Sequence, residues 1–350
     1  KNLYLCANTL PLMYMRNIFF FISISFAAAF IFLSCNEKDK YVTFSGYAQG
    51  GTYAVKINLK GVSRSPEEIG EHIEALLKDI DNSLSGYNRN SILSRFNAGE
   101  KVVPDSLFLD IYARAYEIYR LTGTCVDPSS APLFDLWGFG FTSGTLPSST
   151  EVAAVMEGCG MNRLKVDMAG LIAPDGTLSS HDLLGSGASE MLPKLNYNAI
   201  AQGYSCDVVA RYLYSVGVKD MMVDIGEIFC DGVNPSGRPW TIGIDRPVDG
   251  NSTPGAALQE IFHVPAGPHG VVTSGNYRKF YIKDGRKYAH TIDPRTGYPV
   301  EHNLLSATVT APDATLADAF ATCCMVIGLE EAKELIGTVP DLEACLIYDE

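Results

Sequence analysis

The sequence lacks the short motifs that mark the commonest nucleotide- and metal-binding folds. No GxGxxG follows an expected strand and no GxxxxGK[S/T] phosphate loop occurs, which disfavours the standard dinucleotide and NTP folds. The nine cysteines include no CxxC pair, so neither a zinc site nor a thioredoxin-like redox centre is expected. No structural disulfide is predicted.

Positive charge is also scarce. The 350 residues carry 27 Lys and Arg against 40 Asp and Glu, a net charge of −13, which argues against a nucleic-acid-binding protein. An anionic ligand would therefore need a metal ion or backbone N–H groups to neutralise it. With 47% hydrophobic residues, the chain can bury one large core or two smaller ones.

The N-terminal region reads as a targeting segment. The short basic segment 15–17 precedes an apolar run over 18–33, which is typical of a secretory signal. The run is short for a membrane span, and charged residues follow it closely. Cys35 comes directly after Leu33-Ser34 and resembles the lipobox of bacterial lipoproteins. This predicts a lipid anchor at Cys35, facing the periplasm or exterior; the alternative is an ordinary signal peptide or an anchor helix.

We accordingly divide the chain into a signal segment (1–35), a linker (36–44) and one domain (45–350). Residues 1–14 lie upstream of a plausible start at Met15 and are interpreted as a possible mis-called start. Within the domain, the Gly/Ser-rich stretch 168–193 is expected to form a surface insertion.

Hydrophobic periodicity predicts strands and helices without a regular βαβ order. Strands are expected within 41–59 and at 221–223, 240–244, 258–264, 277–282, 287–292 and 304–310, and helices at about 65–80, 105–121, 202–216, 314–327 and 330–336. This mixture indicates an α+β fold.

One pair of oxygen-bearing side chains stands out on the helix expected over 314–327. Asp318 and Thr322 are four residues apart, so both project from one helical face. A carboxylate and a hydroxyl suit Mg²⁺ better than zinc. From spacing alone, an Asp that caps the helix and a Thr that bonds its own i−4 carbonyl remain the simpler explanation.

A second candidate is the segment from His290 to Gly297. His290 would end a strand before a proline-containing turn, where an imidazole can act as a base near neutral pH. Asp293 and Arg295 more often pair with each other to brace such a turn. Alone, a histidine in this position is structural more often than catalytic.

Glycine-bearing turns are expected at 50–52, 224–227 and 273–276, where backbone N–H groups can approach a phosphate. Tyr87 lies in a polar loop, where an aromatic ring can stack on a flat ligand or pack as an ordinary half-buried tyrosine.

Taken together, these segments resemble the ApbE-type FAD:protein FMN transferases. The resemblance rests on segments that occur in the family's order: 50–53, 84–97, 126–128 with 136–139, 198–207, 224–227, 240–244, 273–277, 290–297, and Asp318 with Thr322. It implies mixed sheets with flanking helices and an FAD cleft between two lobes.

The resemblance also implies roles for individual residues. Asp318, Thr322 and the backbone carbonyl of Ala201 would bind Mg²⁺, and His290 would be the base that acts on the acceptor hydroxyl. The positions expected to line the FAD site are Tyr87, Ala201, Asp224, Gly226, Glu227, Ser274, Gly275, Asp293 and Thr296. Gln202 departs from the family, in which many members have Lys.

The implied reaction is Mg²⁺-dependent transfer of FMN from FAD to a Ser or Thr hydroxyl of an acceptor protein with a Ser/Thr-Gly-Ala-Thr/Ser-like motif, with release of AMP. Two alternatives stay open at this point. One is an FAD pyrophosphatase, in which water replaces the hydroxyl, and the other is a non-catalytic flavin-binding lipoprotein.

Overall fold

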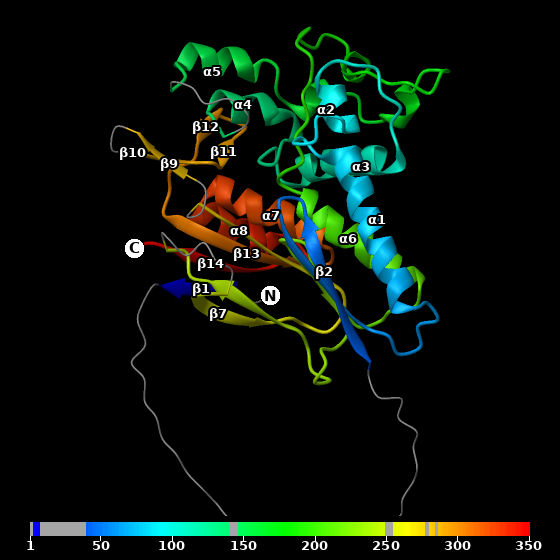
Figure 1. The fold of residues 1–350 in the computed structure, drawn as a ribbon. Helices are drawn as coiled ribbons and strands as arrows, with labels where there is room; N and C mark the ends of the chain where they lie inside the picture. The colour runs from blue at the N-terminus through cyan, green and yellow to red at the C-terminus, as the bar shows by residue number, and fades with distance from the viewer. Residues whose placement is uncertain (1–2, 8–39, 140–145, 249–254, 277–279, 284–285) are drawn as a thin grey trace, which may run out of the picture.

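The structure is a computed structural model that describes residues 3–7, 40–139, 146–248, 255–276, 280–283 and 286–350 (Figure 1). It confirms the α+β class. The apolar run at 18–33 and Cys35 lie outside the described residues, so the signal and lipid-anchor predictions stay predictions. Among the described helices, none has the length and apolar character needed to cross a membrane.

An eight-stranded sheet forms the centre of the described chain. Across it the strands are β1 (Leu3–Ala7), β14 (Glu343–Tyr348), β13 (Leu304–Ala311), β8 (His269–Gly275), β5 (Ile228–Asp231), β4 (Met221–Asp224), β3 (Gly51–Asn58) and β2 (Tyr41–Ala48). The β1–β14 pair is parallel, and the other neighbours are antiparallel. Residues 3–7, which we expected to precede the folded domain, form a strand at one edge of this sheet.

Helices cover one face of this sheet (Figure 1). α1 (Pro66–Leu84) and α6 (Ala201–Ser215) bury Ile69, Ile73 and Leu213 against β3 and β4. α7 (Ala314–Ile327) and α8 (Leu329–Thr338) pack on β8, β13 and β14 through residues such as Phe320 and Ile336. Burial of these apolar faces is the main force that fixes the helices on the sheet.

The opposite face is covered by the antiparallel pair β6 (Thr241–Asp245) and β7 (Leu258–His263). Trp240 and Ile242 pack there against Val271 of β8, and Ile244 contacts Cys345 and Ile347 of β14. Strand β8, which contains Ser274 and Gly275, therefore lies between α7 and this strand pair. Packing on both faces restrains its position.

The remaining elements form a second layer beyond α6 and α7 (Figure 1). They are α2 (Ile92–Asn97), α3 (Ser106–Leu121), α4 (Ala131–Leu136), α5 (Ser149–Met156), the hairpin β9 (Phe280–Lys283) and β10 (Arg286–Ala289), and the short pair β11 (Ile292–Asp293) and β12 (Tyr298–Pro299). The stretch 168–193, expected at the surface, contributes Leu178 and Leu183 to the core beneath α3 while Asp175 stays exposed. Of its short 3₁₀ helices, Ser180–Leu183 buries Ser180 and Leu183, whereas Ala169–Leu171 has no buried residue.

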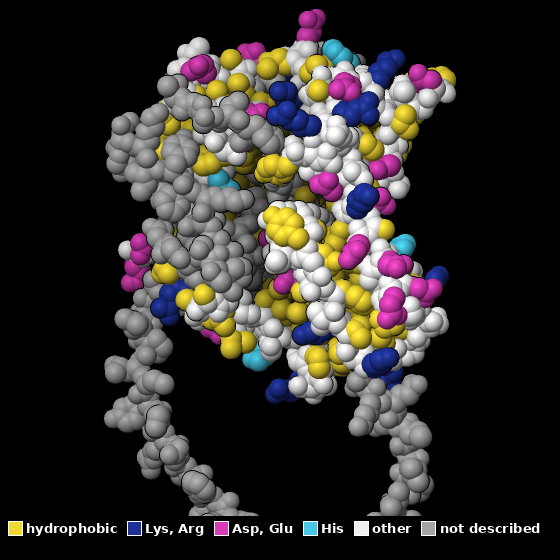
Figure 2. All heavy atoms as spheres, viewed as in Figure 1, with side chains coloured by type: hydrophobic (Ala, Val, Ile, Leu, Met, Phe, Trp, Pro, Cys, Tyr) yellow, Lys and Arg dark blue, Asp and Glu magenta, His cyan; other side chains and the backbone are white. Residues whose placement is uncertain are grey.

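Charged side chains of both signs share the surface. On the face shown in Figure 2, acidic and basic groups are interspersed along the side formed by α1. Mixed charges of this kind keep a surface soluble without creating a strong field of one sign. An anionic ligand would thus be neutralised locally, at a built site, rather than by the general charge of this face.

Most expected elements form where the patterns place them. The capping box at Ser65 and Glu68 begins α1, and α7 occupies the residues expected for it. The strand expected over 287–292 is divided, since β10 ends at Ala289 and Ile292 belongs to β11. Seven cysteines of the described part of the chain are buried, and no disulfide joins them.

Candidate functional site

The start of α7 is held by two aspartates. Asp313 caps the helix by accepting the Leu316 N–H. Asp207 on α6 accepts the backbone N–H groups of Ala314 and Thr315, each at 2.9 Å, together with the Thr315 hydroxyl. Burial raises the pKa of Asp207 to about 6, although these hydrogen bonds lower it. The clamp fixes the position of the helix that carries Asp318 and Thr322.

Asp318 reaches across to the first turn of α6. Its carboxylate accepts the Gly203 N–H at 3.1 Å, two residues along from the predicted ligand Ala201. The two helices approach closely here: a Cβ added to Gly203 would lie only 2.2 Å from the carbonyl oxygen of Ala314. Only glycine therefore allows Asp318 to lie against this turn.

The Asp318 side chain is buried, and no described residue offers it an ion pair. The residue is 5% exposed, and desolvation raises the pKa of its carboxyl to about 8, against the lowering effect of the Gly203 bond. A buried carboxylate of this kind ionises readily only when a cation neutralises it.

Thr322 lies one turn further along α7 and contacts Ser274. The two hydroxyl oxygens are 3.3 Å apart. We expected residues 273–276 to form a turn; that prediction was wrong for Thr273 to Gly275, which belong to the interior strand β8. Ser274 pairs there with Ala307 of β13. The hydroxyl of Ser274 is therefore presented by a strand, which holds it more rigidly than a loop would.

The Ala201 carbonyl takes part in a chain of hydrogen bonds. It accepts the Ser205 hydroxyl at 2.7 Å, and the Gln49 side chain donates to that same hydroxyl oxygen. Sequence reasoning missed both residues. Ser205 lies four residues after Ala201, a spacing that could have revealed it, whereas Gln49 is 156 residues away from Ser205 along the chain and gives no local signal.

The turn at 224–227, which connects β4 and β5, also lies against α6. Gly226 has φ +90°, its N–H is bonded to the Asp224 carboxylate at 3.1 Å, and Gln202 donates to the Ile225 carbonyl at 3.2 Å. Glu227 accepts the Thr273 N–H of β8 at 3.3 Å. Burial raises the pKa of Asp224. The expected turn is thus confirmed, and it lies against both α6 and β8.

The segment from His290 to Gly297 is braced at several points. Asp293 and Arg295 form the bidentate pair that their spacing indicated, with N–O distances of 2.9 to 3.2 Å. The Gly297 carbonyl accepts the Trp137 indole N–H at 2.7 Å. His290 is half-buried and meets the edge of the Phe139 ring, with centroids 6.5 Å apart.

This segment is tied to the end of β8. The hydroxyl of Thr291 donates to the Asn276 side chain at 2.6 Å. Thr291 directly follows His290, and Asn276 directly follows Gly275, the last residue of β8. Thr296 contacts the Asp293 carbonyl within the same turn. His290 is therefore close in the fold to the strand that carries Ser274.

Tyr87 lies in the loop after α1 and is 70% exposed. Its hydroxyl accepts a long hydrogen bond of 3.5 Å from Asn198, three residues before Ala201. Its ring can thus offer a face to a ligand near the start of α6, rather than being packed in the core.

The structure thus brings together the first turn of α6, the 224–227 turn, the end of β8 and one face of α7. The donors are a carboxylate, hydroxyls and a main-chain carbonyl, a set that matches hard cations such as Mg²⁺. Within the described ranges no three His, Cys, Asp or Glu side chains cluster as a metal site. Tyr87 and His290 are placed near this group through their neighbours, Asn198 and Thr291, rather than through Asp318 or Thr322.

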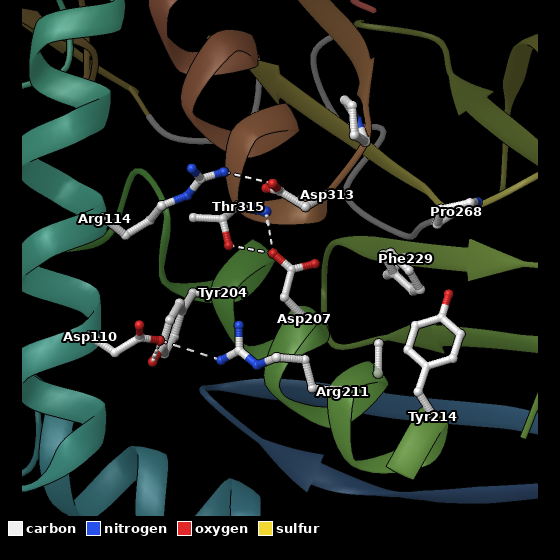
Figure 3. A pocket seen from close by; sticks show the side chains of 12 residues that line it. Asp110, Arg114, Tyr204, Asp207, Arg211, Tyr214, Phe229, Pro268, Asp313 and Thr315 are labelled. Atoms are coloured by element: carbon white, nitrogen blue, oxygen red, sulfur yellow. Dashed lines mark hydrogen bonds and ion pairs between the residues drawn. The ribbon is translucent and has the colours of Figure 1, made fainter. Parts of the chain in front are cut away.

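A separate cavity of about 500 Å³ lies between α3, α6 and the start of α7 (Figure 3). Tyr204, Asp207, Arg211 and Tyr214 line it at helical spacing, on a different face of α6 from Ser205. Its wall includes the ion pairs Arg114–Asp313 and Arg211–Asp110 (Figure 3). The residues that line this cavity are other than the predicted site residues, so it is distinct from the candidate site.

Comparison with known proteins gives one consistent result. The sequence pattern of the ApbE family matches residues 49–346. The FAD:protein FMN transferase of Haemophilus influenzae is 32% identical over 322 residues, covering 89% of this chain and 88% of that protein. The Escherichia coli K12 protein of the same name is 32% identical over 325 residues, with 89% and 87% covered.

Solved structures agree. The flavin transferase ApbE from Vibrio cholerae superposes with a TM-score of 0.71 at 30% identity, covering 89% of this chain and 94% of that one. The apo form of the Pseudomonas stutzeri flavinyl transferase ApbE gives a TM-score of 0.70 at 32% identity, with 85% and 88% covered.

Proposed function

This chain belongs to the ApbE family and is an FAD:protein FMN transferase, and we propose that it transfers FMN from FAD to a Ser or Thr hydroxyl of an acceptor protein and releases AMP. The observation that carries the proposal is the contact of Asp318 with the Gly203 N–H. This contact brings the buried carboxylate to the turn of α6 that contains Ala201. Asp318 and Thr322 project from the same face of α7.

We propose that Asp318, Thr322 and the Ala201 carbonyl hold Mg²⁺. The oxygen-only donor set and the desolvated carboxylate fit this ion. When bound, Mg²⁺ screens the charge of the diphosphate and stabilises the leaving AMP. Ser274, which already contacts Thr322, orients that hydroxyl.

His290 is the proposed general base. As the acceptor oxygen bonds to the phosphorus of the FMN half, the P–O bond to AMP breaks and the acceptor proton moves to the His290 imidazole. The edge of the Phe139 ring and the braced turn that follows His290 limit the movement of the histidine. The protein itself forms no covalent intermediate.

Flavin binding is assigned to the surrounding residues. Tyr87 offers an exposed ring for stacking on the isoalloxazine, and the 224–227 turn, Ser274 and Gly275 are assigned contacts with FAD. Asp293 and Thr296 are assigned to the part of the proposed FAD site beside His290. Because Gln202 is uncharged, the diphosphate depends more on the cation than it would beside a lysine.

We further propose a lipid anchor at Cys35 that holds the enzyme on a bacterial membrane, facing the periplasm or exterior. An acceptor carrying a Ser/Thr-Gly-Ala-Thr/Ser-like motif would meet it there. Mass spectrometry of lipid-modified peptides from expressed protein tests the anchor directly.

Incubation of the mature protein with FAD, Mg²⁺ and a peptide carrying that motif tests the function. A gain of one FMN by the peptide, with one AMP released, is the expected result. FMN and AMP without a modified peptide would identify an FAD pyrophosphatase, and intact bound FAD would identify a flavin-binding protein. Either outcome would overturn the proposed transfer to a Ser or Thr hydroxyl.

A further inference from the structure

A glutamine occupies a turn position that favours other residues. The β2–β3 hairpin closes through Gln49 and Gly50, because Ala48 pairs with Gly51, and both turn residues have positive φ, 52° and 80°. Two-residue turns of this kind prefer Asn-Gly, Asp-Gly or Gly-Gly. A disfavoured residue that is held in such a conformation indicates that its side chain has a functional role.

The Gln49 side chain lies against α6. Gln49 is half-buried, whereas Tyr47 on the same hairpin is 74% exposed. The Nε2 of Gln49 donates to the Ser205 hydroxyl oxygen, and the fully buried Ser205 donates its proton to the Ala201 carbonyl at 2.7 Å. A hydroxyl carries one proton, so Ser205 must accept from Gln49. The three groups form a directional relay that ends on the carbonyl.

We propose that Gln49 is a positioning residue that controls, through Ser205, whether the Ala201 carbonyl is free to bind a divalent cation. The inference rests on the proposed function, in which that carbonyl is a cation ligand. In the arrangement described, the Ser205 proton points at the carbonyl oxygen and repels a cation. Rotation of the Gln49 amide by half a turn puts its Oε1 against Ser205. Ser205 then donates to Gln49, and the carbonyl oxygen becomes available.

Two substitutions separate this relay from an ordinary structural hydrogen bond. Gln49→Met keeps the side-chain length but removes the alternative acceptor, so the Ser205 proton stays on Ala201 and cation affinity falls about fivefold or more. Ser205→Ala removes the competing proton, so affinity stays level or rises. The double variant is expected to behave like Ser205→Ala, because Gln49 acts only through Ser205.

Gln49→Asn is the matched control for the turn itself. Asparagine suits the left-handed backbone better than glutamine but is one methylene shorter and does not reach Ser205. The thermal unfolding midpoint should therefore hold or increase, while cation affinity falls as in Gln49→Met. Restoration of wild-type affinity by Gln49→Asn would show that position 49 serves only the hairpin and would overturn the proposal.

The measurement is Mn²⁺ binding to the full chain, followed by the EPR signal of free Mn²⁺ and by competition with Mg²⁺, without FAD. Wild-type binding that requires Asp318 and is weakened by Gln49→Met supports the relay. Binding that requires Asp318 but is unchanged in Gln49→Met overturns the relay and leaves the proposed function intact. Equal binding by wild type and Asp318→Ala overturns the metal assignment, and the relay with it.

Discussion

Asp207 holds the N-terminus of the helix that carries Asp318, accepting two successive backbone N–H groups, those of Ala314 and Thr315, at 2.9 Å. A carboxylate suits this place because a helix N-terminus exposes unpaired N–H groups and a partial positive charge. The cavity in Figure 3 opens beside this clamp. The position of the proposed metal ligand on α7 therefore depends on a residue outside the proposed set of metal ligands.

Asp207→Asn should loosen the clamp. The amide keeps one oxygen but turns an NH₂ group toward a backbone or hydroxyl donor, so we expect a loss of about 1–3 kcal/mol in the free energy of unfolding. Chemical denaturation at neutral pH measures it. Asp110→Asn, on the rim of the same cavity and largely exposed, is the control and should change stability by less than about 1 kcal/mol. Equal losses in the two variants would contradict the clamp.

Asp318 should give the metal-free protein a characteristic pH dependence. Its pKa is about 8 in the fold, against an ordinary value of 3.8. The folded state thus holds the proton more tightly than the unfolded chain, and the contribution of Asp318 to stability, full below about pH 4, declines as pH rises toward 8. In the presence of EDTA, the free energy of unfolding should fall more steeply from about pH 5 to pH 8.5 in wild type than in Asp318→Asn.

Saturating Mg²⁺ should reduce that decline, since the proposed site binds the cation through the ionised carboxylate. Parallel pH curves for wild type and Asp318→Asn in EDTA would contradict the raised pKa. Asp318→Ala should also lower transfer activity by about 100-fold or more, because the proposed charged metal ligand is lost.

His290→Ala should slow transfer while sparing FAD binding. Loss of a general base lowers the rate by about 10²–10⁴-fold, and the flavin contacts assigned to Tyr87 and the 224–227 turn are untouched. Single-turnover transfer and FAD fluorescence titration measure the two quantities separately. A weakening of FAD binding that accounts for the whole loss of rate would argue against the role as base.

Gly203→Ala should be strongly destabilising. Its Cβ would lie 2.2 Å from the Ala314 carbonyl oxygen, so α6 and α7 would have to separate at a cost of about 1–3 kcal/mol or more. A Cβ on Gly337 in α8 would meet nothing within 4 Å, and Gly337→Ala should stabilise by about 0.5–1 kcal/mol. Thermal unfolding of both variants checks the contrast, and tolerance of alanine at position 203 would contradict the close crossing.

Local chemistry explains how much of the fold was predictable. The capping box at Ser65 and Glu68, and Asp313 before α7, satisfy helix-end N–H groups within a few residues, so the sequence alone locates these helix starts. Thr273 to Gly275 carry turn-type side chains, yet their pairing with Ser306 to Thr308 of β13 makes them part of strand β8. Tertiary pairing overrides local preference there.

The site shows the same division. The i,i+4 spacing of Asp318 and Thr322 is visible in the sequence, and the resemblance to the family supplied Ala201 and His290. Gln49 and Ser205 could not be paired, because their contact joins a hairpin turn to a helix 156 residues away. Leu178 and Leu183 were hidden in a polar stretch, although each has the burial of a core residue.

The first turn of α6 receives Gln49 from a strand hairpin formed early in the chain and Asp318 from a helix formed near its end. Contacts separated so widely in sequence form late in folding, since long loops must close first. A nascent or clipped polypeptide that stops after α6 would hold the carbonyl and its serine but no Asp318 carboxylate. Cation binding through the proposed ligands would therefore require that the chain be complete and folded through α7.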